Sequence, residues 1–321
     1  MAHPPRGFKQ QILRFGLHGR PHFPDNRGAK GGGVAQKGQQ AGGGEGYGLL
    51  APTLVVMGLA LAAPLLLMAL TSLKTQTGIS FAGGWTLDQY DAVLGRASYR
   101  ALLARSVAIS GIVTLVTVAL AYPMAYFVAF HARHKFVWLV ALTIPFWTSY
   151  LLRVFAWKII LGYGGVINSG LMGLHLIDQP LGVLLYNPFA VVVTLAHAWA
   201  AFAILPIYVS LEKIDRSLLE AAADLGDGPL RRFLRITLPL SMPGVIGAAI
   251  LIFVPTTGDF VTPALVGGPK GTMIANLIEV QFNAAGNWPL GAALSLVSMA
   301  VVAVIAGLVV ASARAAAKAA R

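Results

Sequence analysis

The residues best suited to chemistry with a partner lie between Glu220 and Leu240, in the stretch EAAADLGDGPLRRFLRITLPL. Acidic side chains precede a glycine-containing turn and three arginines follow it, while apolar runs long enough to cross a bilayer lie close on both sides. We interpret this charged stretch as a surface that is offered to a soluble partner. The alternatives are a connector with solvated charges and a DNA-binding helix-turn-helix, which the neighbouring spans would keep away from a major groove.

The spacing in this stretch predicts two short helices joined by a turn. Arg216, Glu220 and Asp224 recur every four residues and therefore share one face of the first helix. Gly226 suits the left-handed position after a helix end. Asp227 can then cap a second helix, with Pro229 in its first turn.

The second helix is expected from Leu230 to Thr237, with Pro239 and Pro243 ending it and returning the chain to the membrane. Two sets of side chains are expected on opposite sides of it: Arg231, Arg232 and Arg235 on one, and Leu230, Phe233 and Leu234 on the other. Small side chains on the first helix should let a partner backbone approach closely, and these are Ala221, Ala222 and Ala223.

Composition places this stretch in a membrane protein. Of the 321 residues, 56% are hydrophobic and 11% charged, against about 25% charged in soluble domains. The 36 Gly and 18 Pro fit a polytopic helical protein. The absence of cysteine excludes disulfides, iron–sulfur clusters and thiolate zinc sites. Residues 1–48 are rich in Gly, Gln and basic residues, which predicts a disordered cytoplasmic tail rather than a secretory signal or a nucleic-acid arm.

Six segments are apolar over about 20 residues, the length that a spanning helix needs. The third of them is interrupted by Pro145. The predicted spans are Leu49 to Leu73, Ser106 to Phe130, Phe136 to Trp157, Phe189 to Leu211, Pro243 to Val266 and Leu290 to Ala311. The fold class is therefore an all-α integral membrane protein, with a spanning domain over residues 49–313 and a C-terminal tail over 314–321.

The distribution of Lys and Arg predicts the orientation. The N-terminal tail, the loop 131–135, the loop 212–240 and the C-terminal segment hold seven, two, five and three of the 24 basic residues. Both termini and the charged stretch are therefore expected in the cytoplasm. On the other side, Thr86 and Gln89 have a capping-box spacing that predicts a short helix, and an amphipathic helix is expected over 272–282.

The charged stretch resembles the signature of permease subunits of binding-protein-dependent ABC importers. That signature is Glu-Ala-Ala, three residues, Gly, nine residues, Ile, one residue and Leu-Pro. It falls here without any change of spacing on Glu220, Ala221, Ala222, Gly226, Ile236, Leu238 and Pro239. The segments TLDQYDAVL, FVPTTGDFVTPALVGG and NWPLGAALS are similar to the polyamine branch, typified by the first permease of spermidine/putrescine importers.

This resemblance implies a type I importer permease fold in a bacterial inner membrane. It implies that the loop 212–240 carries the coupling helix, which sits in a groove of the ATPase subunit, with Asp224 and Arg231 added to the signature residues as contacts. It also implies the partners: two ATPase subunits, a second homologous permease and a periplasmic solute-binding protein, in membrane lipid. No cofactor is expected on this chain, and ATP with Mg²⁺ is expected on the ATPase.

An ionisable group near the centre of a spanning helix raises the free energy of membrane insertion by about 2.5–3.5 kcal/mol. Such a group therefore usually faces a cavity or a partner. A polyamine is a polycation, which carboxylates and aromatic faces attract. The candidates for its path are Asp259, Thr257, Arg153, Trp157, Tyr150 and Glu279. For Asp259, a structural role in capping or in pairing with Arg153 stays open. Glu279 could instead be a solvated charge or a contact for the binding protein.

Two other functional classes remain as alternatives. An ion-gradient-driven secondary transporter would require internal repeats and several buried acids, and Asp259 is the one clear acid inside a span. A membrane enzyme would require clustered His, Asp or Glu, whereas the seven histidines are scattered. The sequence contains no phosphate loop ending in Gly-Lys-Ser/Thr, so ATP hydrolysis is expected on another subunit.

Overall fold

The computed structural model describes residues 43–78 and 80–319. Contacts divide the chain into two units, Met1–Met57 and Gly58–Arg321, and helix α1 (Gly43–Ser72) contains the boundary between them. Among the described residues, every other helix and strand belongs to the second unit.

The end of each predicted tail that adjoins the spanning domain is helical in the structure. Helix α1 begins six residues before the predicted border at Leu49, and residues 1–42 of that tail lie outside the described residues. Helix α13 (Trp288–Ala319) continues through most of the predicted tail 314–321. The extension of α13 into RAAAKA is helical because alanine has the highest helix propensity.

Six helices in the described part of the chain are long and apolar enough to cross a membrane, as predicted. Many of their outward-facing side chains are large and apolar, which suits a surface covered by lipid or by another membrane helix. The six are Leu50–Ser72, Ala97–Phe130, Tyr150–Gly173, Pro188–Glu212, Pro229–Thr257 and Trp288–Ala315.

The interruption that Pro145 predicted in the third span is confirmed, but the predicted bounds are wrong. The chain forms α4 (Lys135–Thr143), a 3₁₀ turn (Ile144–Trp147) and α5 (Tyr150–Leu161), followed by the short α6 (Val166–Gly173). Pro145 lacks an N–H donor, and Thr148 and Ser149 then take extended backbone angles. The break is therefore several residues long, and the long apolar helical segment is shifted to Tyr150–Gly173.

Three helices form the centre of the second unit: α3 (Ala97–Phe130), α7 (Pro188–Glu212) and α10 (Leu238–Thr257). Their shared core includes fully buried Val113, Leu195 and Ile252. At Gly244, α10 closely approaches α7, because a Cβ there would collide with the carbonyl of Pro206 and with Ser210. Close backbone contact through a small residue is how membrane helices pack.

A second, smaller core lies at one end of these helices, where α2 (Asp88–Gly95), α12 (Ile274–Phe282) and α13 meet. Its buried members are Val93, Ile274, Leu290, Ala293 and Leu294. The predicted amphipathic helix over 272–282 is thus confirmed as α12, with Ile274 buried. The predicted helix after Thr86 is also present as α2, but Thr86 Oγ1 accepts from the N–H of Asp88 rather than forming the capping box.

A short hairpin at this end adds strands to a chain predicted as all-α. Strand β1 (Lys74–Thr77) pairs antiparallel with β2 (Ser80–Trp85), and Gly78 turns the chain with φ of +62°. The side chain of Gln76 donates to the carbonyl of Gly286 at 2.6 Å and accepts from the N–H of Trp288 at 3.0 Å. These bonds attach the hairpin to the loop between α12 and α13.

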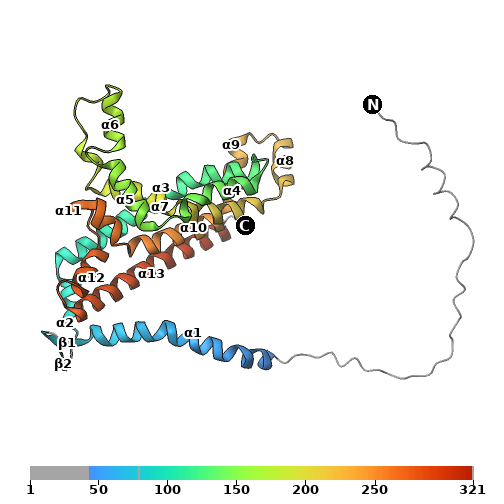
Figure 1. Cartoon of the computed structure of the whole chain (residues 1–321). Coiled ribbons are helices and arrows are strands. Elements are labelled where there is room, and N and C mark those ends of the chain that lie inside the picture. Colours follow the sequence, from blue (N-terminus) through green and yellow to red (C-terminus); the bar gives the residue numbers. More distant parts are fainter. Residues whose placement is uncertain (1–42, 79, 320–321) are drawn as a thin grey trace, which may run out of the picture. The chain divides into compact units, whose positions relative to one another are not determined.

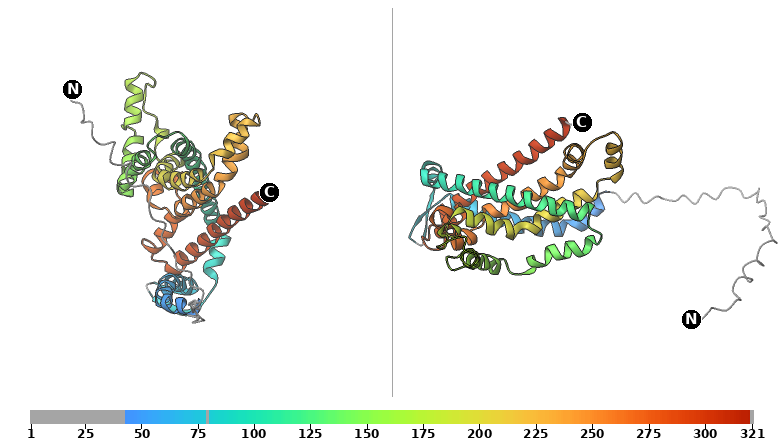
Figure 2. Two further views of the ribbon diagram at one scale, coloured as in Figure 1. Left: turned by 90° about the vertical axis from the view of Figure 1, so that its right-hand side faces the viewer. Right: turned by 90° about the horizontal axis from the view of Figure 1, so that it is seen from above.

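The helices α8 (Arg216–Asp224) and α9 (Pro229–Arg232) lie at the opposite end of the bundle from the hairpin and α12 (Figure 1). Figure 2 shows the same separation from above, with the C-terminal end of α13 on the side of α8 and α9. The remaining short elements, a 3₁₀ turn (Gly182–Leu184) and α11 (Gly268–Gly271), lie in the connections before α7 and α12. The fold therefore carries its two candidate sites at opposite ends.

Candidate functional site

Helix α8 begins at an aspartate cap. Oδ1 of Asp215 accepts a hydrogen bond from the backbone N–H of Ser217 at 2.9 Å. That bond, with a smaller contribution from the Ser217 hydroxyl, lowers the pKa of Asp215 because both stabilise the ionised form. The guanidinium of Arg216 donates to the carbonyl of Ala129 in α3 at 3.4 Å, which attaches the start of α8 to the bundle.

Helix α8 ends as predicted at a left-handed glycine. Gly226 has φ of +86°, and its N–H donates to the carbonyl of Ala223 at 2.9 Å. The N–H of Asp227 donates to the carbonyl of Ala222 at 2.9 Å, which completes a Schellman motif. The turn is therefore fixed by backbone geometry that glycine adopts at low cost.

The predicted capping role of Asp227 is wrong. Gly228 precedes α9 without a side-chain cap, and Pro229 occupies the first turn as predicted. The Asp227 carboxylate instead lies 3.4 Å from the guanidinium of Arg231 and 3.8 Å from that of Arg235. Two arginines within reach one and two turns along the helix compete successfully for the carboxylate.

The predicted helix end at Pro239 and Pro243 is also wrong. Helix α9 passes through a π-helical turn (Phe233–Thr237) directly into α10, and the N–H of Leu238 donates to the carbonyl of Phe233 five residues back. Wider turns of this kind absorb irregularities that would otherwise break a helix. The α8–α9 segment (residues 216–237) is therefore continuous with a spanning helix.

The side chain of Phe233 packs this continuous helix against α3. Its ring meets Tyr122 edge-on with centroids 5.7 Å apart, and Tyr126 at 6.2 Å. About two turns further along the helix, the hydroxyls of Tyr122 and Ser241 lie 2.8 Å apart. A shift of α9 would therefore displace both α10 and the end of α3.

The side chains of the α8–α9 segment divide differently from the prediction in two places. The guanidinium of Arg232 is not grouped with those of Arg231 and Arg235, because it donates to the carbonyl of Leu219 in α8 at 3.5 Å. Ala222 is buried at 8% exposure, so the exposed small residues are Ala221 and Ala223. Glu220 and Asp224 are exposed, as a partner-facing role requires.

Exposed apolar side chains accompany these charges. A hollow of about 550 Å³ is lined by Gly226, Gly228, Pro229, Leu230, Arg231, Leu234 and Arg235. Leu225 and Leu230 are 87% and 71% exposed. Of the other signature residues, Ile236 and Leu238 are half-buried and Pro239 is exposed. Apolar and arginine side chains around a concave surface are typical of contacts between proteins.

Asp259 lies in the break between α10 and the next helical turns, which include a π-helical turn (Pro263–Gly267). Its Oδ1 accepts from the N–H of Val261 at 2.9 Å and of Thr262 at 3.4 Å, and its Oδ2 accepts from the hydroxyl of Tyr150 at 2.5 Å. The Tyr150 hydroxyl is also 2.6 Å from that of Thr262. Capping, one of the two structural roles considered for Asp259, is thus present.

The other structural role, pairing of Asp259 with Arg153, is wrong for the described residues. The guanidinium of Arg153 donates to the carbonyl of Ala198 at 3.2 Å and lies 5.1 Å from the ring centroid of Phe146. Trp157 packs against the main core and meets the ring of His197 at 5.6 Å. Tyr150, Arg153, Trp157 and Asp259 thus belong to one neighbourhood around α5 and α7.

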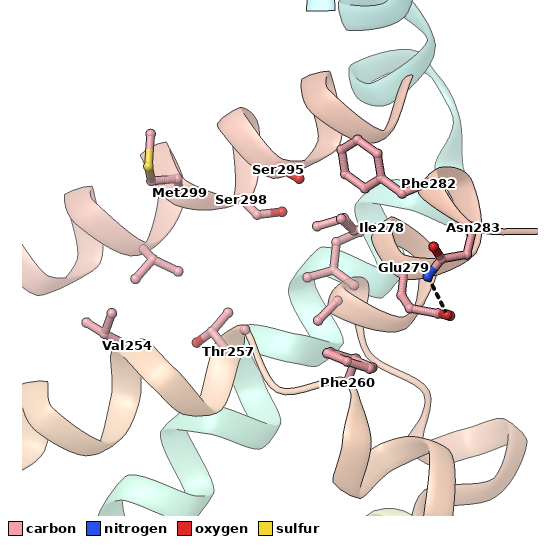
Figure 3. Close-up of a pocket in the computed structure, with 14 residues that line it drawn as sticks. Val254, Thr257, Phe260, Ile278, Glu279, Phe282, Asn283, Ser295, Ser298 and Met299 are labelled. Atoms are coloured by element: carbon pink, nitrogen blue, oxygen red, sulfur yellow. Dashed lines mark hydrogen bonds between the residues drawn. The ribbon is translucent and has the colours of Figure 1, made fainter. Parts of the chain in front are cut away.

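Thr257 and Glu279 line a different cavity, of about 490 Å³, between α10, α12 and α13 (Figure 3). Glu279 is half-buried, and its Oε1 accepts from the side-chain amide of Asn283 at 3.0 Å. Thr257 is buried and donates to the carbonyl of Phe253 at 2.9 Å. The predicted path residues therefore form two groups rather than one.

Sequence reasoning missed three residues of these sites. Phe233 was assigned to an apolar side without a partner, Thr262 was not considered, and Ser298 lies in an apolar span where a hydroxyl is conspicuous. A polar residue within a span is the signal that could have indicated Ser298. Among the described residues, no cluster of three His, Asp or Glu side chains could hold a metal ion.

Comparison with known proteins identifies the family. Residues 52–318 match the model of the binding-protein-dependent transport system inner membrane component. The chain is 39% identical over 236 residues to the spermidine/putrescine transport system permease protein PotB of Escherichia coli, covering 73% of this chain and 85% of that protein. It is 34% identical to PotB of Haemophilus influenzae over 235 residues, which are 73% of this chain and 82% of that one.

The fold also matches solved structures. A bacterial alginate ABC transporter in complex with a pentasaccharide-bound periplasmic protein superposes with a TM-score of 0.67 at 16% identity, over 85% of this chain and 94% of that chain. At that identity, the match shows the fold alone. The chain is thus a multi-pass protein of the inner membrane that belongs to the family of binding-protein-dependent ABC transporter permeases, a transport component rather than an enzyme.

Proposed function

We propose that this permease imports a polyamine, spermidine or putrescine, as the pore-forming subunit of an ATP-driven transporter. The proposal of this solute class is supported by the relatives, whose names assign them spermidine and putrescine transport, and by the length of the match. Family membership favours ATP-driven import over the gradient-driven alternative.

The partners follow from this proposal. A second homologous permease completes the pore, two ATPase subunits bind ATP and Mg²⁺, and a periplasmic protein delivers the solute. This chain itself holds no cofactor and contacts lipid rather than nucleic acid. With the N- and C-termini in the cytoplasm, the α8–α9 segment faces the ATPase, because it lies at the same end of the bundle as the end of α13 (Figure 1).

The observation that carries the mechanism is the continuity of α9 with α10. We place the ATPase on the exposed face of α8 and on the hollow beside Gly226, where Glu220, Ala221, Asp224 and Arg231 are accessible. Ala222, Ile236 and Leu238, which are buried or half-buried, hold that face on the bundle, and Pro239 follows them on the exposed surface. Closure of the ATPase would displace α9, and the π-helical turn at Phe233 would pass the displacement to α10 and α3.

The solute path is proposed in two places. The first is the neighbourhood of Tyr150, Arg153, Trp157 and Asp259, where a carboxylate adjoins aromatic rings. Its Asp259 carboxyl group caps a helix and is the acidic group of this neighbourhood that a cation would contact. The second is the cavity that contains Thr257 and Glu279.

Uptake by the assembled transporter tests the proposal. The complex with its ATPase, second permease and binding protein is reconstituted in liposomes and given labelled putrescine or spermidine. ATP-dependent accumulation of the polyamine is expected, with none in the presence of a non-hydrolysable ATP analogue. Accumulation driven by an ion gradient without ATP, or no accumulation of either polyamine, would contradict the proposal.

A further inference from the structure

We infer that the cavity between α10, α12 and α13 is a subsite that binds one aminoalkyl end of the solute, with its ammonium group at Glu279. The inference rests on the proposed function for the identity of the solute, but not for the chemistry of the site. The lining comes from all three helices and from residues just after α10 and α12, and the members that carry the argument are Phe260, Glu279, Phe282, Asn283 and Ser298.

Glu279 is the one ionisable residue among these lining residues. Its Oε1 accepts from Asn283, and its Oε2 accepts no hydrogen bond from the residues that the structure describes, so one oxygen is available for a charged donor. A half-buried carboxylate with a single neutral hydrogen-bond donor is poorly compensated, and a cation at this position would compensate it. Figure 3 shows Glu279 and Asn283 together at one end of the cavity.

A buried hydroxyl marks a second polar point in the cavity. Ser298 is 8% exposed, and its Oγ has no hydrogen-bond partner in the described structure. Its side chain points from α13 into the cavity, as Figure 3 shows. A buried polar atom without a partner requires an explanation, and a bound polar molecule supplies one.

The walls between these two points suit methylene groups. Val254, Ile278, Met299 and Val302 are apolar, and the rings of Phe260 and Phe282 lie near Glu279 (Figure 3). Aromatic faces attract ammonium groups, and the rings add apolar surface for an alkyl chain. The cavity volume of about 490 Å³ lies within the roughly 300–1,000 Å³ of small-molecule sites.

A single carboxylate in apolar surroundings sets the specificity. It can neutralise one ammonium group, so the site should bind the end of a diamine and equally a monoamine of the same length. An anion should be excluded, because it would add a second negative charge to a poorly hydrated site. Recognition of both ends of a polyamine would then require groups outside this cavity.

The absence of cysteine from the sequence makes a direct test practical. In the assembled transporter, Ser298→Cys is reacted with cationic 2-aminoethyl and anionic 2-sulfonatoethyl methanethiosulfonate, and the modified mass of this chain is followed. The cationic reagent should react about tenfold faster or more, since a charged cleft concentrates counter-ions by that order. Putrescine and butylamine should both slow the reaction, whereas butanol should not.

Three variants control this measurement. Glu279→Gln combined with Ser298→Cys should remove the preference for the cationic reagent. Glu279→Asp keeps the charge and should keep the preference, which covers the case in which the glutamine variant fails to assemble. Ser169→Cys, on the exposed surface of α6 and outside both proposed sites, should show reagent rates that do not change with Glu279→Gln.

The outcomes separate this inference from the proposed function. Equal rates for both reagents, or a cation preference that persists in Glu279→Gln, would overturn the subsite even if the transporter accumulates polyamines. Protection by putrescine but not by butylamine would overturn recognition of a single end. Protection by both amines in a transporter that accumulates no polyamine would uphold the subsite and overturn the proposed solute.

Discussion

The ring of Phe233 stands edge-on against Tyr122, with their centroids 5.7 Å apart and the ring planes at 89°. Phe233 opens the π-helical turn between α9 and α10, and Tyr122 lies in the last third of α3. This contact joins the segment that we assign to the ATPase to two spanning helices at once.

Phe233→Ala should uncouple ATP hydrolysis from transport. The aromatic pair contributes roughly 0.5–1.5 kcal/mol of interaction free energy beyond that from burial of its surface. Its loss would leave α9 free to move without α3. We expect uptake to fall about tenfold while ATPase subunits still co-purify and hydrolyse ATP. Tyr122→Phe is the matched control, because it keeps the ring and removes the hydroxyl near Ser241. Equal uptake in wild type and Phe233→Ala would refute the coupling role of the contact.

Gly226→Ala should weaken the turn between α8 and α9. A residue with a Cβ at φ of +86° raises the conformational free energy of the folded backbone by about 1–2 kcal/mol. This cost comes from the backbone alone, because no neighbouring atom lies within 4 Å of that Cβ. Gly228→Ala is the control, since Gly228 has φ of −66° and equal space. ATP-driven uptake should fall in the first variant and stay near wild type in the second. If both variants were equally active, the left-handed turn would not be required.

Much of the α8–α9 segment was predictable because local chemistry decides it. Gly226 adopts the left-handed backbone that glycine favours, and Pro229 lies where its missing N–H costs nothing. The capping prediction for Asp227 failed because arginines in the next two turns compete for its carboxylate. The predicted helix end at Pro239 failed because a π-helical turn leaves no mark in composition.

Longer-range features were not predictable from one sequence. Pro145 indicated an interruption, but not that Thr148 and Ser149 would extend it and divide the span into α4 and α5. The β1–β2 hairpin was missed because its strands are short and lack regular alternation of apolar and polar residues. The cavity at Glu279 depends on how three helices pack, so neither its lining nor the isolation of Ser298 could be derived.

Asp259→Asn should separate charge from capping. The asparagine side-chain oxygen can still accept from the N–H of Val261, so the melting temperature of the purified complex should stay close to that of wild type. Loss of the negative charge should lower polyamine uptake, whereas binding of the periplasmic protein should persist. Normal uptake with a normal melting temperature would restrict Asp259 to its structural role.

The cap of α8 should depend on pH in a defined direction. The pKa of Asp215 is lowered in the folded protein, so its stabilising effect is complete above the ordinary value of 3.8 and is lost as the pH falls through the lowered value. Hydrogen exchange in α8, corrected for intrinsic rates, should therefore show equal protection from neutral pH down to mild acid. Asp215→Asn keeps a neutral cap and should show no acid-dependent loss. Loss of protection in wild type near neutral pH would contradict the assignment.

The most direct test of the ATPase-binding role uses two exposed alanines at opposite ends of the bundle. Ala221→Trp places a bulky side chain on α8, and Ala284→Trp places one just after α12. Co-purification of the ATPase subunits with each full-length variant is measured from membranes that contain all partners. The account predicts that Ala221→Trp inserts normally but loses most of the ATPase and of ATP-driven uptake, while Ala284→Trp retains the ATPase. Full retention of ATPase and uptake by Ala221→Trp would contradict it.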